Sequence, residues 1–226
     1  MRKSYKIRLL SALIFVFVLY IFSLSGCDNQ EINTYYSTRH VLSGMNNIDL
    51  EKYEEAIADF DKAIKLNSNN ASAYEQRGLA KLGLGFYQES SRDLNKAIKL
   101  DPDNAYAYKL RGFSKHHLGF YQEAIADYDK AIKLDPNNTP AYYLRGSVKY
   151  QLKQHFLAIA DFDKAIKHNP NNAKAYALRG LAKSQLGLYQ EASRDLDKAI
   201  ALDPDNADTY KLRRLEKSLR MQHEKN

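Results

Sequence analysis

Apolar side chains along most of the chain recur at three- and four-residue spacing, in short segments separated by polar turns. Residues 72–84 and residues 88–100 are two such segments, and this spacing is typical of helices that bury one face. Gly85 lies between the two segments, and Pro102 follows the second. Helices commonly end at these two residue types. The pattern therefore predicts a pair of short helices joined by a tight turn.

The same pattern recurs every 34 residues without insertion. One column of the repeat is aromatic and comprises Tyr74, Tyr108, Tyr142, Tyr176 and Tyr210. A glycine column comprises Gly44, Gly78, Gly112, Gly146 and Gly180. Two columns of small residues comprise Ala56, Ser90, Ala124, Ala158 and Ala192, and Ala63, Ala97, Ala131, Ala165 and Ala199. A proline column ends the unit and comprises Pro102, Pro136, Pro170 and Pro204.

Each recurring column has a physical reason. Gly78 and Ser90 are small because the two helices of a unit are expected to cross closely there. Ala97 is small because the following unit packs against it, while Tyr87 and Leu94 fill the space around these contacts. Asparagines stand where the next first helix needs an N-cap, at Asn104, Asn138, Asn172 and Asn206. The columns therefore predict stacked helical hairpins.

These columns resemble the pattern of the tetratricopeptide repeat. The resemblance covers residues 37–206, and it implies an all-α, right-handed solenoid of five helical hairpins followed by a C-terminal capping helix. The five units are expected at 37–70, 71–104, 105–138, 139–172 and 173–206, with the cap at 207–226.

Two columns depart from the family pattern. The usual leucine before the glycine is replaced by Arg77, Arg111, Arg145 and Arg179, and the usual tyrosine three residues later by Lys81, Lys115, Lys149 and Lys183. An aspartate column could supply the partner charges, and it comprises Asp59, Asp93, Asp127, Asp161 and Asp195. We interpret these columns as an internal ladder of ion pairs between helices; the alternative is a cationic binding stripe.

The two ends of the stack are atypical, as expected where one face lacks a neighbour. In the first unit His40 occupies the aromatic column, and Ser68 replaces the proline. Near the C-terminus Arg214 stands at the glycine column and no second helix is predicted. We expect a capping helix whose inward-facing residues are Leu212, Leu215 and Leu219.

The N-terminus has the pattern of a bacterial lipoprotein signal peptide. A basic segment is followed by the apolar run LLSALIFVFVLYIFSL and then by SGC. The sequence from Leu24 to Cys27 resembles a lipobox, which implies cleavage after residue 26 and lipidation of Cys27, with residues 27–36 as a tether. An uncleaved anchor is the alternative. The resemblance implies a lipid anchor in the bacterial envelope facing the periplasm, and Asp28 favours the inner membrane over the outer.

Charge and residue chemistry exclude several function classes. The net charge is +7, but residues 1–26 carry four cations and no acid, so the remainder carries only +3, and we expect no nucleic-acid binding. Cys27 is the one cysteine, so no intramolecular disulfide can form. We find no phosphate loop and no nucleophile motif. His116 and His117 are adjacent on a predicted helix and point about 100° apart, so they are not spaced to bind one metal ion. We therefore predict no enzyme activity, no metal or other cofactor, and no small-molecule substrate.

The family resemblance implies that the first helices line a concave groove for a partner protein, as an extended peptide or a helix. The residues expected to line this groove are Glu75, Lys109, Phe113, His116, Tyr143, Ser147, Tyr150 and Lys174. Leu79 and Leu181 lie at equivalent positions, but could equally pack only against neighbouring helices. The predicted function is a membrane-anchored interaction scaffold. The alternative is a module that binds peptidoglycan or assists a peptidoglycan hydrolase, with Phe113, Tyr143 and Tyr150 stacking on sugars.

Overall fold

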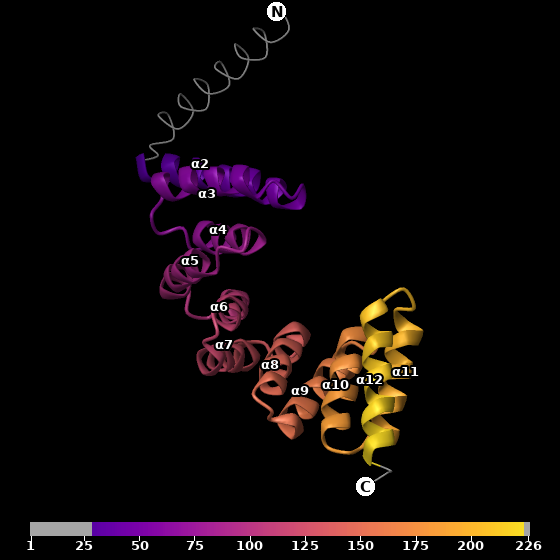
Figure 1. Cartoon of the computed structure of the whole chain (residues 1–226). Helices are drawn as coiled ribbons and strands as arrows, with labels where there is room; N and C mark the ends of the chain where they lie inside the picture. The colour runs from indigo at the N-terminus through magenta and orange to yellow at the C-terminus, as the bar shows by residue number, and fades with distance from the viewer. Residues whose placement is uncertain (1–28, 224–226) are drawn as a thin grey trace, which may run out of the picture. The chain divides into compact units, whose positions relative to one another are not determined.

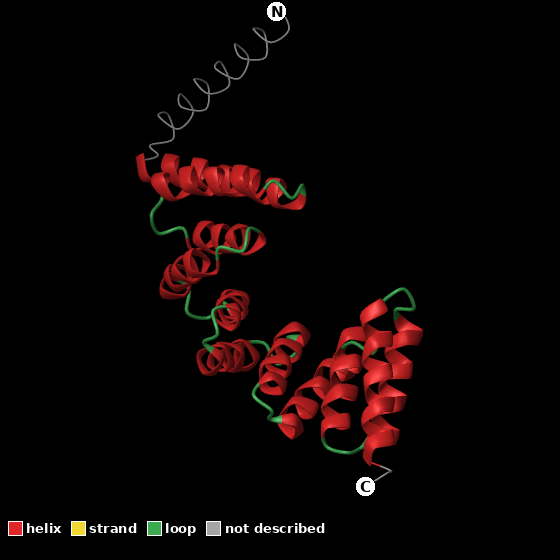
Figure 2. Cartoon of the chain, viewed as in Figure 1, coloured by secondary structure: helices red, strands yellow, loops and turns green. Residues whose placement is uncertain are grey.

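The computed structural model of the chain describes residues 29–223, and these residues form helices and connecting turns with no strand (Figure 2). This confirms the predicted all-α architecture. The signal peptide, Cys27 and Asp28 lie outside the described residues. Among the described helices, none is long and apolar enough to cross a membrane.

The helices divide into two compact units, one ending at Gly85 and one beginning at Phe86, which are described separately (Figure 1). The first unit contains α2 (Asn29–Asp49), α3 (Tyr53–Leu66) and α4 (Ala71–Gly83). Helix α2 packs along α3, and α3 packs against α4. Because α2 already begins at Asn29, residues 29–36 are helical and the predicted start of the first hairpin at residue 37 is too late.

The second unit contains the remaining helices, and their order follows the 34-residue repeat (Figure 1). They are α5 (Tyr87–Leu100), α6 (Ala105–His117), α7 (Tyr121–Leu134), α8 (Thr139–Gln151), α9 (His155–His168), α10 (Ala173–Gln185), α11 (Tyr189–Leu202) and α12 (Ala207–His223). The pairs α6–α7, α8–α9 and α10–α11 are hairpins with extensive contacts.

The helix ends follow the predicted turn chemistry. The side-chain oxygens of Asn104, Asn138 and Asn172 accept hydrogen bonds from backbone N–H groups three residues later, at 3.0–3.1 Å. Gly119 and Gly187 have φ angles of 81° and 76°, in the left-handed region that favours glycine after a helix. Sequence alone therefore locates most helix boundaries to within one or two residues.

Close approach of the paired helices explains the glycine column. A Cβ atom added at Gly112 would lie 2.8 Å from the Tyr128 ring, and one added at Gly146 would lie 2.9 Å from the Phe162 ring. Tyr128 and Phe162 are fully buried between the two helices of their hairpins. The two small-residue columns are also buried, as predicted. The core of each hairpin is thus one large side chain set among small ones.

Within the second unit the first helices of the hairpins form their own layer. Helix α6 contacts α8, α8 contacts α10, and α10 contacts α12. Between the described second helices, α5, α7, α9 and α11, no pair makes contacts of similar extent. In a curved stack the more closely spaced layer lies on the inside, so the first helices line the inner side of this unit.

The C-terminal helix α12 packs against α10 and α11 as a cap. Leu212 packs against buried Ala177 and Leu196, as predicted. Leu215, however, is 47% exposed, so its predicted inward orientation is wrong. Glu216 is the fully buried residue instead, and it accepts hydrogen bonds from Arg213 and, at 3.1 Å, from the Ser193 hydroxyl. The side chain of Leu219 lies outside the described part of the chain.

Candidate functional site

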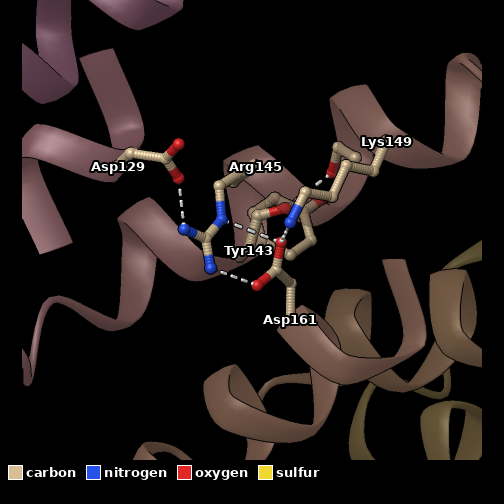
Figure 3. A network of polar contacts seen from close by, with 6 residues as sticks. Asp129, Tyr143, Arg145, Lys149 and Asp161 are labelled. Atoms are coloured by element: carbon tan, nitrogen blue, oxygen red, sulfur yellow. Dashed lines mark hydrogen bonds and ion pairs between the residues drawn. The ribbon is translucent and has the colours of Figure 1, made fainter. Parts of the chain in front are cut away.

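Arg145, Lys149 and Asp161 form a compact ion cluster between α8 and α9 (Figure 3). Arg145 donates from Nε to Asp161 Oδ2 at 2.9 Å and from Nη2 to Oδ1 at 2.5 Å. Lys149 Nζ donates to Asp161 Oδ2 at 2.8 Å. The Asp161 side chain is 5% exposed, so a buried carboxylate is held by two cations.

The same cluster recurs in the neighbouring hairpins. Asp127 accepts from Arg111 Nη2 at 2.5 Å and pairs with Lys115 at 3.0 Å. Asp195 accepts from Arg179 Nη2 at 2.6 Å and pairs with Lys183 at 3.0 Å. The predicted ladder of ion pairs is therefore confirmed in all three complete hairpins of the second unit.

Each of these arginines also reaches the preceding second helix, which the sequence interpretation missed, and Arg213 of α12 does the same. Arg111 Nη1 donates to Asn95 Oδ1 on α5 at 2.7 Å. Arg145 Nη1 donates to Asp129 on α7 (Figure 3). Arg179 Nη1 donates to Asp163 on α9 at 2.6 Å, and Arg213 Nε donates to Asp197 on α11 at 2.7 Å. Arg111, Arg145 and Arg179 thus each join two second helices, through one residue 16 positions earlier and one residue 16 positions later in the sequence. Arg213 contacts the residue 16 positions before it.

The environment of these arginines explains why they replace leucine. Arg145 is stacked over the Tyr142 ring at 5.6 Å, and Arg179 over the Tyr176 ring at 5.3 Å. Burial alone would lower the pKa of Arg145 and Arg179, but the hydrogen bonds and charges of their aspartate partners outweigh it and raise the pKa. The arginine and lysine columns therefore have a structural role, which argues against a cationic binding stripe.

A different set of side chains lies on one face of α6. They are spaced at i, i+3, i+7, i+10 and i+11, so they share one helical face, and they are Tyr106, Lys109, Phe113, His116 and His117. The same positions of α8 are Pro140, Tyr143, Ser147, Tyr150 and Gln151. We call these residues, together with Lys174 of α10, the first-helix strip. It contains seven of the eight residues predicted to line a groove.

One contact connects the α6 and α8 parts of the strip, and others lie within each helix. His116 Nε2 lies 3.0 Å from Gln151 Oε1, across the junction between the two helices. Lys109 Nζ lies 4.1 Å above the Tyr106 ring, and Ser147 Oγ donates to the Tyr143 backbone carbonyl at 2.9 Å. Phe113, Tyr143 and Tyr150 are half-buried. Each of these aromatic rings thus packs against the protein on one side and is exposed to solvent on the other.

At both ends of the predicted groove, several of the expected lining residues are buried. In α10 the equivalent positions Ala177, Leu181 and Ser184 are buried, and Ala177 packs against Leu212 of α12, so of the five positions Lys174 and Gln185 are exposed here. Glu75 belongs to the first unit and is only 8% exposed, with a hydrogen bond from the Gln76 side chain at 2.8 Å. Little of Glu75 is available to a partner, so we omit it from the strip.

His116 and His117 belong to a ring cluster rather than a metal site. The His117 ring stacks on Tyr87 at 4.4 Å, and Phe113 lies 4.5 Å from it. Burial, and then the neighbouring His116, lower the pKa of His117, which keeps the ring neutral at pH 7. Among residues 29–223 no three His, Cys, Asp or Glu side chains are grouped so that they could hold a metal ion.

A second exposed apolar feature was missed by the sequence interpretation. Phe156 and Leu157 at the start of α9 are 73% and 54% exposed. The other second helices of the second unit carry Gln and then Glu at these two positions, for example Gln122 and Glu123. The sequence signal that could have revealed this feature is the replacement of Gln and Glu by two apolar residues at positions where packing does not require them.

Comparison with known proteins identifies the repeats. Family models described as TPR repeat or tetratricopeptide repeat match residues 48–85, 71–104, 115–153, 139–172 and 173–206. Together these matches cover roughly two-thirds of the chain. No curated protein sequence matches it.

Solved structures show the same fold. MamA matches at 28% sequence identity with a TM-score of 0.66, over 73% of this chain and 96% of MamA. The TPR domain of Arabidopsis OM64 matches at 31% identity with a TM-score of 0.52, over 53% of this chain and 98% of that domain. YrrB, described as a TPR protein with an unusual peptide-binding site, matches at 22% identity with a TM-score of 0.63, over 83% and 91% of the two chains.

Proposed function

The chain belongs to the tetratricopeptide repeat family, and we propose that it is an envelope scaffold that holds a partner protein on the first-helix strip. Proteins of this family are generally interaction scaffolds rather than enzymes, and they bind partners on extended inner surfaces. The strip lies on the inner helix layer of the second unit, where an extended or helical segment could contact several repeats at once.

The observation that carries this proposal is the variation between the repeats themselves. Columns that form the ion clusters keep one residue type from hairpin to hairpin, as in Arg111, Arg145 and Arg179. The strip columns change from unit to unit: one comprises Lys109, Tyr143 and Ala177, and the next comprises Phe113, Ser147 and Leu181. The members of these columns in α6 and α8 are half-buried rather than in the core, so they are available for recognition of a partner.

Membrane attachment is part of the proposal and rests on the sequence. The apolar run, the small residues Ser25 and Gly26, and Cys27 together support lipidation of this cysteine. Several acyl chains anchor a protein stably, whereas one chain binds only marginally. Anchoring of this kind would hold the repeats close to a bacterial membrane surface on its periplasmic side, with Asp28 favouring the inner membrane.

Photo-cross-linking in the host cell tests the proposed site with the full chain. A photoreactive amino acid placed at Phe113 or Tyr150 should cross-link one protein partner, whereas the same residue at Lys133 or Lys167, which are exposed on second helices, should not. Equal cross-linking from all four positions would contradict the proposal. So would an absence of protein cross-links together with retention of the chain on isolated peptidoglycan, which would favour the cell-wall-binding alternative.

A further inference from the structure

One face of α2, in the first unit, carries exposed apolar side chains. Tyr35, Leu42 and Met45 are 46%, 61% and 40% exposed. Together with exposed Thr38 they are spaced at i, i+3, i+7 and i+10, so they share one face of the helix. We call these four residues the α2 stripe.

Comparison with a later hairpin shows why this face is uncovered. Leu42 lies three repeats before Leu144, in the same column. Leu144 of α8 packs against a cluster that includes Ala124 and Tyr128 of α7, the preceding second helix. No described helix precedes α2, so Leu42 has no such neighbour. The end of a repeat stack normally has a polar outer face for solubility, so we expect another surface to cover the α2 stripe.

The threonines on this face do not depend on water as a hydrogen-bond acceptor. Thr34 Oγ1 donates to the backbone carbonyl of Gln30 at 2.8 Å, and Thr38 Oγ1 donates to that of Thr34 at 3.0 Å. The helix itself thus accepts both hydroxyl protons. Polar groups that enter an apolar environment need partners of this kind within the protein. The face from Thr34 to Met45 is therefore suited to partial removal from water.

The charges of α2 fit a membrane surface. The acidic residues Glu31 and Asp49 lie at the two ends of this face, four residues before Tyr35 and four after Met45. The neutral part between Tyr35 and Met45 is only about 15 Å long, so it can lie in an interface but cannot span a bilayer. Arg39 is exposed and lines the same shallow hollow as Tyr35, where its guanidinium can donate to lipid phosphates.

The length of the chain brings α2 close to the proposed anchor. Asp28 alone separates Cys27 from Asn29, the first residue of α2. Both interpretations of the N-terminus, lipidation of Cys27 and an uncleaved apolar segment, would put residue 27 at the membrane. Two residues span at most roughly 7 Å, so α2 would begin directly at the bilayer surface.

We infer that α2 lies along the membrane surface, with the α2 stripe buried at the boundary between lipid headgroups and acyl chains. This inference rests on the proposed membrane attachment and goes beyond it, because an anchor alone would leave the first unit free to turn. Attachment beside α2 makes lipid the favoured occupant, since it gives the stripe a high effective concentration of lipid. A second copy of the chain would have to meet the stripe by diffusion.

Tryptophan fluorescence tests the inference, because the chain contains no tryptophan of its own. Leu42→Trp places one in the α2 stripe. Ala58→Trp places one on exposed α3 at a similar level, since the adjacent Asp59 accepts a hydrogen bond from Ser43. Each full chain is reconstituted in vesicles of dibrominated phosphatidylcholine and phosphatidylglycerol. Bromine should quench Leu42→Trp at least about threefold more than Ala58→Trp, because an interfacial helix buries its apolar face by roughly 5–10 Å.

A second comparison separates the stripe from the anchor. Adding Thr38→Glu/Met45→Glu to Leu42→Trp should reduce its quenching to the level of Ala58→Trp, because two carboxylates oppose burial of the stripe. The control Ser68→Glu/Asn69→Glu adds the same charge at exposed positions outside α2 and should leave the quenching unchanged. Circular dichroism checks that all variants are folded.

Equal quenching of the two tryptophans, in chains that float with the vesicles, would overturn the inference and leave membrane attachment intact. Protection of Leu42→Trp from aqueous iodide without quenching by bromine, together with cross-links between two α2 helices, would also overturn it and indicate a second copy as the occupant. If the chains do not float with the vesicles, the proposed attachment fails, and the inference fails with it.

Discussion

Arg145 and Asp161 join the two helices of one hairpin by two parallel hydrogen bonds, with donor–acceptor distances of 2.9 Å and 2.5 Å (Figure 3). Through its remaining nitrogen Arg145 also reaches Asp129 in the preceding hairpin. At a position where the family usually has a leucine, this chain thus has an arginine that joins neighbouring repeats, which we call a polar staple. This geometry makes the stability of the stack depend on one arginine per unit.

The first prediction concerns this staple. Arg145→Ala should lower the free energy of unfolding by about 2 kcal/mol, because it leaves the buried Asp161 with Lys149 as its one cationic partner at 2.8 Å. Removal of one partner from a buried pair typically costs roughly 3–5 kcal/mol, and the remaining contact with Lys149 reduces that cost here. Urea denaturation followed by circular dichroism measures the difference.

A matched control separates the staple from general loss of charge. Lys167→Ala removes an exposed cation from α9 and should change stability by less than about 0.5 kcal/mol. The double variant Arg145→Ala/Asp161→Ala should be less destabilised than the sum of its single variants. If Arg145→Ala were no more harmful than Lys167→Ala, the structural role of the arginine column would be refuted.

The second prediction concerns the hydroxyl of Tyr128. This group is buried and has no hydrogen-bond partner among the described residues. Burial, and then the charge of Asp127, raise the pKa of Tyr128, so the hydroxyl stays protonated. Tyr128→Phe should stabilise the protein by about 1 kcal/mol, since an unpaired buried hydroxyl costs free energy. Thermal denaturation of the variant measures this gain.

The equivalent residue of the next hairpin provides the reverse experiment. Phe162 is fully buried at the corresponding position, so Phe162→Tyr should destabilise the fold by a similar amount. A stabilising Phe162→Tyr, or a destabilising Tyr128→Phe, would show that the hydroxyl finds a partner in solution.

The third prediction concerns the turn between α8 and α9. Lys153 has a φ angle of 59°, whereas the equivalent turn residues Gly119 and Gly187 have φ angles of 81° and 76°. Lys153→Gly should stabilise the protein by about 0.5–1 kcal/mol, because relief of the left-handed strain exceeds the extra entropy of an unfolded glycine. Gly119→Lys should have the opposite effect in the same denaturation assay. If both variants were stabilised, or both were destabilised, this explanation would be contradicted.

Sequence periodicity predicted much of the fold because each unit repeats the same packing solution. Gly112 against Tyr128, the Asn104 cap and the Gly119 turn all follow from recurring columns. The helical start at Asn29 was missed because residues 29–36 lie before the first unit of the repeat.

Burial of individual side chains on the first helices and the cap was harder to predict. Leu181 and Ala177 occupy inner positions of α10, but docking of α12 covers that region, and this depends on tertiary contacts beyond the repeat. Leu215 is exposed because Glu216 takes the buried position beside Arg213. Burial at these positions depends on which helix packs against them, and the local sequence pattern does not encode that packing.

The fourth prediction concerns the membrane anchor. Cys27→Ala should abolish incorporation of labelled fatty acid and leave the precursor uncleaved, because the cysteine thiol is the proposed acceptor. Cys27→Ser is a closely matched second variant, since it keeps the size and removes only the thiol. Mature, labelled protein from either variant would rule out the lipoprotein proposal.

The central claim is that the first-helix strip, rather than another exposed surface, holds the partner protein. The test measures the affinity of the full chain for the cross-linked partner in Phe113→Ala/Tyr143→Ala and in Phe120→Ala/Phe156→Ala. The second pair removes two exposed rings outside the first helices, at 53% and 73% exposure. We predict a loss of about tenfold or more in the first pair and little change in the second, with both variants folded by circular dichroism. Loss of the partner in the second pair but not the first would contradict the claim.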